Sequence, residues 1–139
     1  MDRRSFIRLS VFGVTSSIIT PKESLASSSK DAGHSYLTQN SPGPWGQQIG
    51  IHLPRIGVLK EDSKTRIKVV TPHTMHRFDH YISHHIIMNE DFKTIADRMF
   101  DPLKDRSAIS HFQLGNYRGR IHVLSVCNRH STWLNHVDV

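Results

Sequence analysis

The sequence has a single cysteine, Cys127, among its 139 residues, so no intrachain disulfide can form. It also lacks a long apolar run, because residues 11–19 are far fewer than the roughly 20 that span a bilayer. No run of lysines or arginines with interleaved aromatics accompanies the net charge of +6, which disfavours nucleic-acid binding. What stands out instead is a lone thiol together with eleven histidines.

The first 26 residues have the organisation of an export signal. Arg3 and Arg4 open a basic segment, an apolar run follows, and Ser24-Leu25-Ala26 is an A-x-A-like cleavage site. We predict a twin-arginine signal peptide, a flexible polar leader and one folded domain, over residues 1–26, 27–41 and 42–139. The mature protein is then periplasmic or otherwise exported, with no stable membrane insertion; an uncleaved anchor is the alternative.

Short β-type runs separated by turn signals fill the domain, at residues 66–70, 81–88, 108–114 and 118–126. Residues 92–100 suit either a strand or a helical turn. Gly115-Asn116 predicts a hairpin between the last two runs. The final run is apolar on both faces, which indicates a central strand with Cys127 at its end. The pattern predicts an all-β fold, an immunoglobulin-like antiparallel β-sandwich.

Three blocks contain candidate metal ligands. Cys127 and His130 have a C-x-x-H spacing on a turn, which lets a thiolate and an imidazole reach one metal ion. A loop after Pro72 carries three further histidines, and His52 precedes a proline-stiffened segment. Thiolate with imidazoles suits zinc, copper or iron. Taken singly, each histidine is equally well an ordinary surface or sheet residue.

Together these blocks resemble the superoxide reductases, that is, neelaredoxins and the iron domain of desulfoferrodoxins. That family carries H-x-P early, H-P-M followed by H-Y-I in the middle, and C-N-x-H-G-x-W near the end. The corresponding blocks occur here in the same order: His52-Leu53-Pro54, His73-Thr74-Met75, His80-Tyr81-Ile82 and Cys127-Asn128-Arg129-His130-Ser131-Thr132-Trp133. The resemblance covers about residues 42–133, nearly all of the predicted domain.

The resemblance implies one non-haem iron that alternates between Fe2+ and Fe3+. The four nitrogen ligands in the plane would be His52, His73, His80 and His130, with Cys127 as the axial and catalytic thiolate. The implied reaction is reduction of superoxide to hydrogen peroxide with an electron from an external donor, which the sequence does not identify. The family's fold is an immunoglobulin-like sandwich, in agreement with the predicted strands.

The sequence departs from the family pattern at three places. Gly50 and Ile51 stand where the family has glutamate and a lysine that attracts superoxide. The middle histidines are one residue further apart than usual, so His76 is an alternative to His73 as a ligand. Ser131 stands where the family has glycine. The first departure bears on activity more than on metal binding.

Two other classes of protein fit parts of the pattern. A cupredoxin-like electron carrier would also be a small exported sandwich, but its weak methionine ligand follows the last histidine, and no methionine follows Met99 here. A non-catalytic metal-binding module is the second alternative. The oligomeric state stays open, a homo-oligomer included. Asp79 is a candidate hydrogen-bond partner for the imidazole of His80.

Overall fold

The structure is a computed structural model that describes residues 36–139. The predicted signal peptide and most of the predicted leader lie outside the described residues. Within residues 36–139, none of the helices has the length and apolar character needed to cross a membrane. The described part consists of two short helical segments and seven strands: η1 (Gly43–Gln48), α3 (Ile49–His52), β1 (Arg55–Glu61), β2 (Lys64–Thr74), β3 (Ile82–Met88), β4 (Thr94–Met99), β5 (Ser107–Gln113), β6 (Arg120–Cys127) and β7 (Thr132–Asp138).

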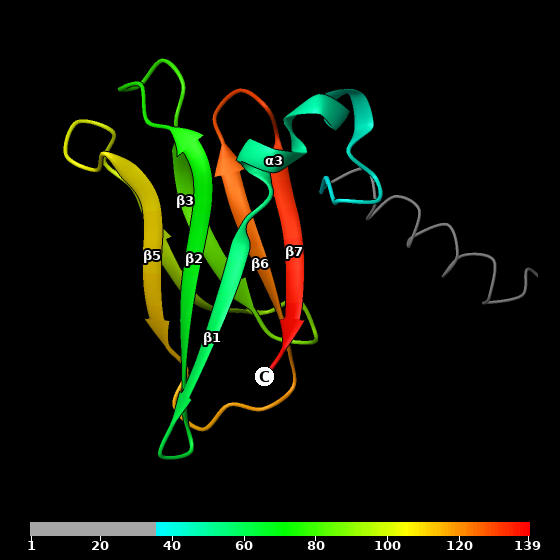
Figure 1. The fold of residues 1–139 in the computed structure, drawn as a ribbon, viewed down its shortest axis with the longest axis vertical. Helices are drawn as coiled ribbons and strands as arrows, with labels where there is room; N and C mark the ends of the chain where they lie inside the picture. Colours follow the sequence, from blue (N-terminus) through cyan, green and yellow to red (C-terminus); the bar gives the residue numbers. More distant parts are fainter. Residues whose placement is uncertain (1–35) are drawn as a thin grey trace, which may run out of the picture. The chain divides into compact units, whose positions relative to one another are not determined.

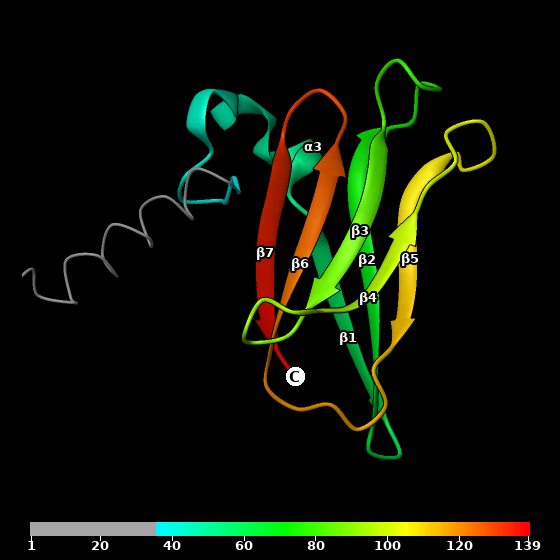
Figure 2. The ribbon, with the colours of Figure 1, turned by 180° about the vertical axis from the view of Figure 1, so that it is seen from behind.

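The strands form two antiparallel sheets that pack face to face, in the orders β1-β2-β5 and β4-β3-β6-β7 (Figures 1 and 2). The predicted β-sandwich is therefore confirmed. The strand that ends in Cys127 is an internal strand, as its two apolar faces indicate. One end of the sandwich gathers α3, the loop that follows β2 and the loop between β6 and β7 (Figure 1). The three predicted ligand blocks thus lie at the same end of the fold.

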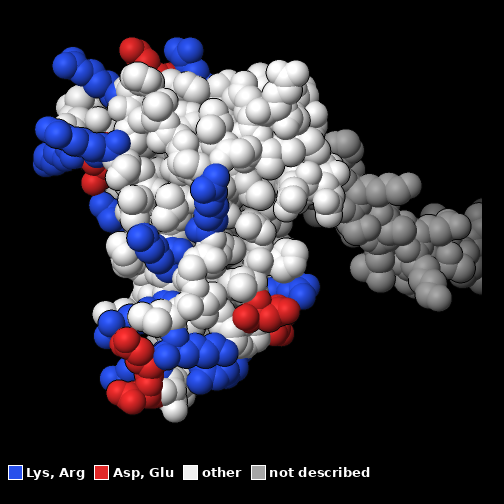
Figure 3. Space-filling view, in the orientation of Figure 1, with Lys and Arg blue, Asp and Glu red and all other residues white. Residues whose placement is uncertain are grey.

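Alternation along β2 shows why these residues form a half-buried strand. Side chains at every second position are buried, whereas Lys64, Arg66 and Lys68 between them are exposed. The buried face packs against a core cluster that includes Ile67, Val69 and residues from the opposite sheet. On the face shown in Figure 3, the basic side chains lie in separate groups.

The predicted hairpin between residues 108–114 and 118–126 is wrong. β5 pairs with β2, whereas β6 pairs with β3 and β7, so the chain crosses from one sheet to the other. Gly115 does turn the chain, with a φ of +58° that favours glycine. However, six residues separate Gln113 from Arg120, more than the two to five typical of a hairpin loop. Turn chemistry fixes local geometry but not the strand with which the chain next pairs.

The sequence does not predict strands β1 and β7, and it leaves residues 92–100 open between a strand and a helical turn. β1 is exposed at six of its seven positions, so no apolar alternation marks it. β7 mixes polar and apolar residues, and only Trp133 within it is fully buried. Residues 92–100 form strand β4 rather than a helical turn. Edge strands β1, β4 and β7 therefore carry weak patterns, whereas edge strand β5 and the central strand β2 alternate clearly.

Contacts with the sheet begin before the predicted start of the domain. The N–H of Leu37 donates to the carbonyl of Thr132 at 2.8 Å, and the N–H of Leu134 donates to the carbonyl of Leu37 at 2.7 Å. Leu37 forms an isolated bridge with Trp133 and is buried. The last residues of the predicted leader therefore lie along β7.

A buried imidazole lies between the two sheets. His85 has no exposed surface, and its ring nitrogens lie 2.8 Å from Thr71 Oγ1 and 2.7 Å from Ser110 Oγ. Burial, and to a lesser extent the charge of Arg98, lowers the pKa of His85 from 6.5 to about 3. The side chain is therefore neutral in the folded protein at physiological pH.

We expect the metal-free protein to lose stability as the pH falls from 6.5 towards 3, in part through His85. In that window the unfolded state takes up a proton that the folded state excludes, so unfolding is favoured by up to about 1.4 kcal/mol per pH unit. His85→Gln cannot titrate and should give a shallower slope in denaturant unfolding between pH 6.5 and 4. Equal slopes in the two proteins would show that His85 does not contribute.

Candidate metal centre

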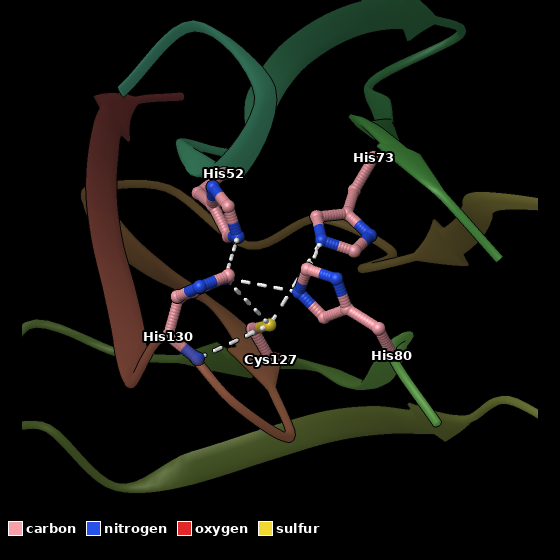
Figure 4. Close-up of side chains that lie close together, drawn as sticks. All are labelled: His52, His73, His80, Cys127 and His130. Carbon is pink, nitrogen blue, oxygen red and sulfur yellow. Dashed lines mark hydrogen bonds between the residues drawn. The ribbon is translucent and has the colours of Figure 1, made fainter. Parts of the chain in front are cut away.

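Five side chains from different parts of the chain converge at one end of the sandwich. Each offers one ligand atom, and all five atoms lie within 4.8 Å of one another: His52, His73, His80, Cys127 and His130 (Figure 4). These are the five residues that the resemblance implies. The group mixes one thiolate with four imidazoles, a donor set that metal ions of intermediate softness prefer.

Two of the five ligands are carried by strands and three by connecting segments. His73 lies near the end of β2 in one sheet, and Cys127 ends β6 in the other. His52 ends the short helix α3, while His80 and His130 lie in the loops before β3 and before β7. The packing of the two sheets therefore places His73 and Cys127 near each other, and the connecting segments bring the other three histidines to them.

The nitrogen atoms have the spacing of ligands around one metal ion. His80 Nε2 lies 3.0 Å from His73 Nε2 and 2.9 Å from His130 Nδ1. His130 Nδ1 in turn lies 3.1 Å from His52 Nε2. Bonds of about 2.1 Å from a metal to nitrogen place adjacent corners of a square about 3.0 Å apart, and those of a tetrahedron about 3.4 Å apart. The three separations fit a square arrangement.

The sulfur lies symmetrically with respect to this arrangement. Cys127 Sγ is 3.9 Å from His73 Nε2 and also 3.9 Å from His130 Nδ1, which are opposite corners of the nitrogen set. The side chain is buried, so little water reaches the thiolate. The chemistry of the donor set, four imidazoles and one thiolate, therefore fits the iron that the resemblance implies.

Two imidazoles are held in a defined tautomer by backbone carbonyls. His52 Nδ1 donates to the carbonyl of Gln48 at 3.0 Å, and His73 Nδ1 donates to the carbonyl of Thr74. The proton on Nδ1 leaves the lone pair of Nε2 directed at the cluster. Such partners orient ligating histidines and raise their basicity.

The pKa values of three of these histidines are lowered. Burial is the main cause for His52, His73 and His80, and the neighbouring imidazoles add charge repulsion. Backbone hydrogen bonds oppose the shift at His52 and His73 but do not reverse it. These three imidazoles are therefore neutral at pH 7, which is the form that binds a metal ion.

The loop from Cys127 to Ser131 presents backbone donors to the sulfur. The N–H groups of Arg129 and His130 lie 3.5 Å and 3.4 Å from Cys127 Sγ, and the N–H of Cys127 donates to the carbonyl of Ser131. Ser131 has a φ of +69°, in the left-handed region that favours glycine. Serine therefore adopts this turn at some conformational cost.

Asn128 joins the loop that carries Cys127 and His130 to the loop that carries His80. Its side-chain amide donates to the carbonyls of Phe78 and Asp79, and its side-chain carbonyl accepts from the N–H of Tyr81. The backbone N–H of Asn128 also donates to the carbonyl of Tyr81. Asn128 therefore supports more than its own turn, because it fixes one ligand loop against another.

Two tryptophans flank the imidazoles. Trp133 is fully buried, stacks on His52 with ring centroids 5.6 Å apart, and donates from Nε1 to the carbonyl of His130 at 2.8 Å. Trp45 of η1 lies edge-on to His130, with centroids 4.7 Å apart. The motif identifies Trp133 in the sequence, whereas no sequence signal identifies Trp45.

Of the two histidines that the sequence leaves open as the second ligand, His73 lies in the cluster and His76 does not. His76 pairs with His80 through backbone hydrogen bonds at the base of a tight loop, and its exposed side chain is outside the cluster. The longer spacing is thus accommodated by this loop, with Arg77 at a φ of +44°. The predicted partner of His80, Asp79, is exposed and makes no side-chain hydrogen bond to that imidazole within residues 36–139.

Replacing His73 is expected to weaken metal binding, whereas replacing His76 is not. His73→Ala removes one of four clustered nitrogens, so the affinity for Co2+ should fall by at least about 100-fold, beyond the effect usual for outer partners of a ligand. His76→Ala is the matched control in the same loop and should bind Co2+ like the native protein. Competitive metal titration measures both. The opposite ranking would assign the ligand to His76.

Comparison with known proteins gives a likeness of fold at low overall sequence identity. No protein-family model and no curated protein matches the chain. The structure is similar to a superoxide reductase (neelaredoxin) from Ignicoccus hospitalis, with a TM-score of 0.63, 19% identity, and coverage of 77% of this chain and 95% of that chain. It is also similar to the superoxide reductase from Nanoarchaeum equitans, with a TM-score of 0.52, 19% identity and coverage of 65% and 94%.

A third similar structure is a single-residue variant of a superoxide reductase (neelaredoxin) from Archaeoglobus fulgidus in the reduced form. Its TM-score is 0.55 at 18% identity, over 67% of this chain and 91% of that chain. At such identities the likeness establishes the fold, a sandwich of the kind that superoxide reductases have. What the site does must be argued from its own residues.

Proposed function

We propose that the protein is a superoxide reductase-type enzyme that holds one non-haem iron and reduces superoxide to hydrogen peroxide. The observation that carries this proposal is the convergence of four imidazole nitrogens and one thiolate in a single group. The sandwich fold shared with superoxide reductases supports it. In this reaction superoxide takes up one electron and two protons to give hydrogen peroxide. An external donor then returns one electron to the protein.

Iron, when bound, would supply a one-electron Fe2+/Fe3+ couple. His52, His73, His80 and His130 would hold it through the nitrogens that converge in the cluster. The thiolate of Cys127 would add negative charge to the site and so raise the electron density of a bound ion. The N–H groups of Arg129 and His130 point at the sulfur and moderate that charge. The burial of Cys127 shields the thiolate from solvent.

The donor set favours iron over the two competing metals. Structural zinc sites are tetrahedral with four ligands, whereas five donor atoms converge here and three nitrogen separations fit a square. Blue-copper sites have two histidines, one cysteine and a weak methionine ligand. The group here has four histidines, twice the number in a blue-copper site.

The test is to load the purified protein anaerobically with iron and to mix it with superoxide generated by pulse radiolysis. We expect about one iron per chain, as a single mononuclear site requires, and a bimolecular reaction that yields hydrogen peroxide. The oxidised protein should show a visible thiolate-to-iron charge-transfer band. Iron binding without any reaction with superoxide would instead support the non-catalytic metal-binding module.

We further propose that the protein is exported through the twin-arginine route, on the basis of Arg3, Arg4 and Ser24-Leu25-Ala26. That route carries folded proteins, so iron can be inserted before export. Replacing both arginines with lysine should keep the precursor in the cytoplasm, whereas Arg8→Lys, which alters the same basic segment, should not. Cell fractionation decides, and unchanged export of the double variant would contradict the proposal.

A further inference from the structure

Side chains between the sheets are arranged in layers, because residues two apart on a strand point to the same face. One layer, on the side away from the metal centre, is apolar and contains Val69, Ile87, Phe112 and Val123. The layer at the metal centre contains His73, Ile82, Ala108 and Cys127. Between them lies a layer of four buried polar side chains, which we call the polar layer: Thr71, His85, Ser110 and Ser125.

The polar layer is a connected hydrogen-bond network. Thr71 Oγ1 lies 2.8 Å from His85 Nε2 and 2.8 Å from Ser125 Oγ, and His85 Nδ1 lies 2.7 Å from Ser110 Oγ. Among buried side-chain nitrogen and oxygen atoms of residues 36–139, only His122 Nδ1 is without a partner. The polar layer therefore leaves none of its own buried polar atoms unpaired.

These hydrogen bonds connect the two sheets. Thr71 of β2 and Ser110 of β5 belong to one sheet, and His85 of β3 and Ser125 of β6 belong to the other. Apolar packing is not directional and tolerates small shifts of one sheet against the other. A fully paired polar network has a geometry of its own and so specifies one relative position.

That relative position determines where the two strand-borne ligands meet. Thr71 precedes His73 by two residues on β2, and Ser125 precedes Cys127 by two residues on β6. The bond between the hydroxyls of Thr71 and Ser125 thus lies one layer below the ligand pair. His73 Nε2 and Cys127 Sγ, which come from opposite sheets, are 3.9 Å apart.

We propose that Thr71, Ser125 and His85 are positioning residues of the metal centre, which hold β2 against β6 and thereby set the separation of His73 Nε2 and Cys127 Sγ. The inference rests on the proposed function, in that it takes these two atoms to be ligands. None of the three residues belongs to the ligand group, so they act through the strands rather than by touching the metal ion. The strength of the bond between thiolate and metal then depends on hydrogen bonds in the core.

The test compares two threonine-to-valine variants on the same face of the same strand. Thr71→Val removes the hydroxyl shared by His85 and Ser125 while keeping the shape of the side chain. Thr65→Val is the matched control, because Thr65 is also buried and its hydroxyl accepts a hydrogen bond from Arg118. Thr65 lies about 20 Å from Thr71 along β2, at roughly 3.3 Å per residue. Both variants lose a buried hydroxyl, so both should unfold at lower denaturant concentration.

Only Thr71→Val should change the metal centre. Its affinity for Co2+ should fall by about 10-fold or more, the effect usual for outer partners of a ligand. The thiolate-to-metal charge-transfer band of its Co2+ and Fe3+ forms should shift, and Thr71→Ser should restore both properties. Thr65→Val should match the native protein in both. Equal affinities and bands in Thr71→Val and Thr65→Val would overturn the proposal.

Ser125→Ala provides a second test that does not depend on the folding of Thr71→Val. It cuts the link between β2 and β6 at its other end, so it should produce the same direction of change in affinity and band. An unchanged centre in folded Ser125→Ala would also overturn the proposal. Failure of the native iron protein to react with superoxide, with the cobalt results as expected, would refute only the proposed reaction. A native protein that binds no Co2+ would refute both.

Discussion

Cys127→Ser is expected to abolish the thiolate-to-iron charge-transfer band and to reduce the reaction with superoxide to the background rate. Serine has nearly the same size, but its hydroxyl stays protonated near neutral pH and does not supply a soft, negatively charged ligand. The loss of a direct ligand should lower iron affinity by at least about 100-fold, above the range for outer partners. Optical titration with iron and pulse radiolysis measure the two effects.

The control separates loss of the ligand from loss of the fold. Cys127 is buried in an apolar cluster with Ile82, Phe100 and Ala108, so a serine hydroxyl there also costs stability. Cys127→Ala keeps the cluster apolar and likewise lacks the thiolate, so it should show the same spectroscopic loss with a smaller change in metal-free stability. A charge-transfer band that persists in either variant would exclude Cys127 as the ligand.

The five candidate ligands could be found from the sequence because their surroundings are local. Cys127 and His130 share one turn, and His52 and His80 each stand beside residues that set their loop or helix end. The choice between His73 and His76 was not local, since it depends on how the loop closes through the pairing of residues 76 and 80.

The fold class was predictable for a similar reason, and its topology was not. The central strand β6 is buried at consecutive positions, so both of its faces are largely apolar in the sequence. Edge strand β1 gives no such signal, and Gly115 turns the chain without indicating that the next strand joins the other sheet. Pairing between distant strands depends on packing that no short window of sequence contains.

The polar layer illustrates a third limit. Thr71, His85, Ser110 and Ser125 lie on four strands and are separated by up to 54 positions along the chain. Each occupies an inward position in a strand whose neighbouring inward residues are mostly apolar. Taken alone, each looks like a minor interruption of an apolar pattern. Only the register of the sandwich shows that the four interruptions meet.

The departure at Gly50 and Ile51 leads to the second prediction, which concerns the approach of superoxide. Ile51 is 46% exposed beside the ligand His52, and a side chain built at Gly50 would meet no atom within 4 Å. This side of the centre therefore has room for a charged side chain but carries none at these two positions. A positive charge does act on the centre from Arg129. Burial and the neighbouring imidazoles are the larger causes of the lowered pKa of His80, and the charge of Arg129 lowers it further.

We expect Ile51→Lys to accelerate the bimolecular reaction with superoxide by about 10-fold, because a fixed positive charge near the site attracts a small anion. The rate should also fall more steeply with salt than in the native protein, since screening acts over about 10 Å at 0.1 M ionic strength. Pulse radiolysis of the iron-loaded proteins at two salt concentrations measures both quantities.

Leu59→Lys is the matched control for added charge. Leu59 is also an exposed apolar residue, but it lies on β1 near the turn at the opposite end of the sandwich (Figure 1). The two variants have the same net charge, so a general effect of charge would accelerate both equally. Local attraction predicts a faster reaction and steeper salt dependence in Ile51→Lys alone. Equal rates in the two variants would mean that the missing lysine does not limit the encounter, and that superoxide reaches the site under the charges already present.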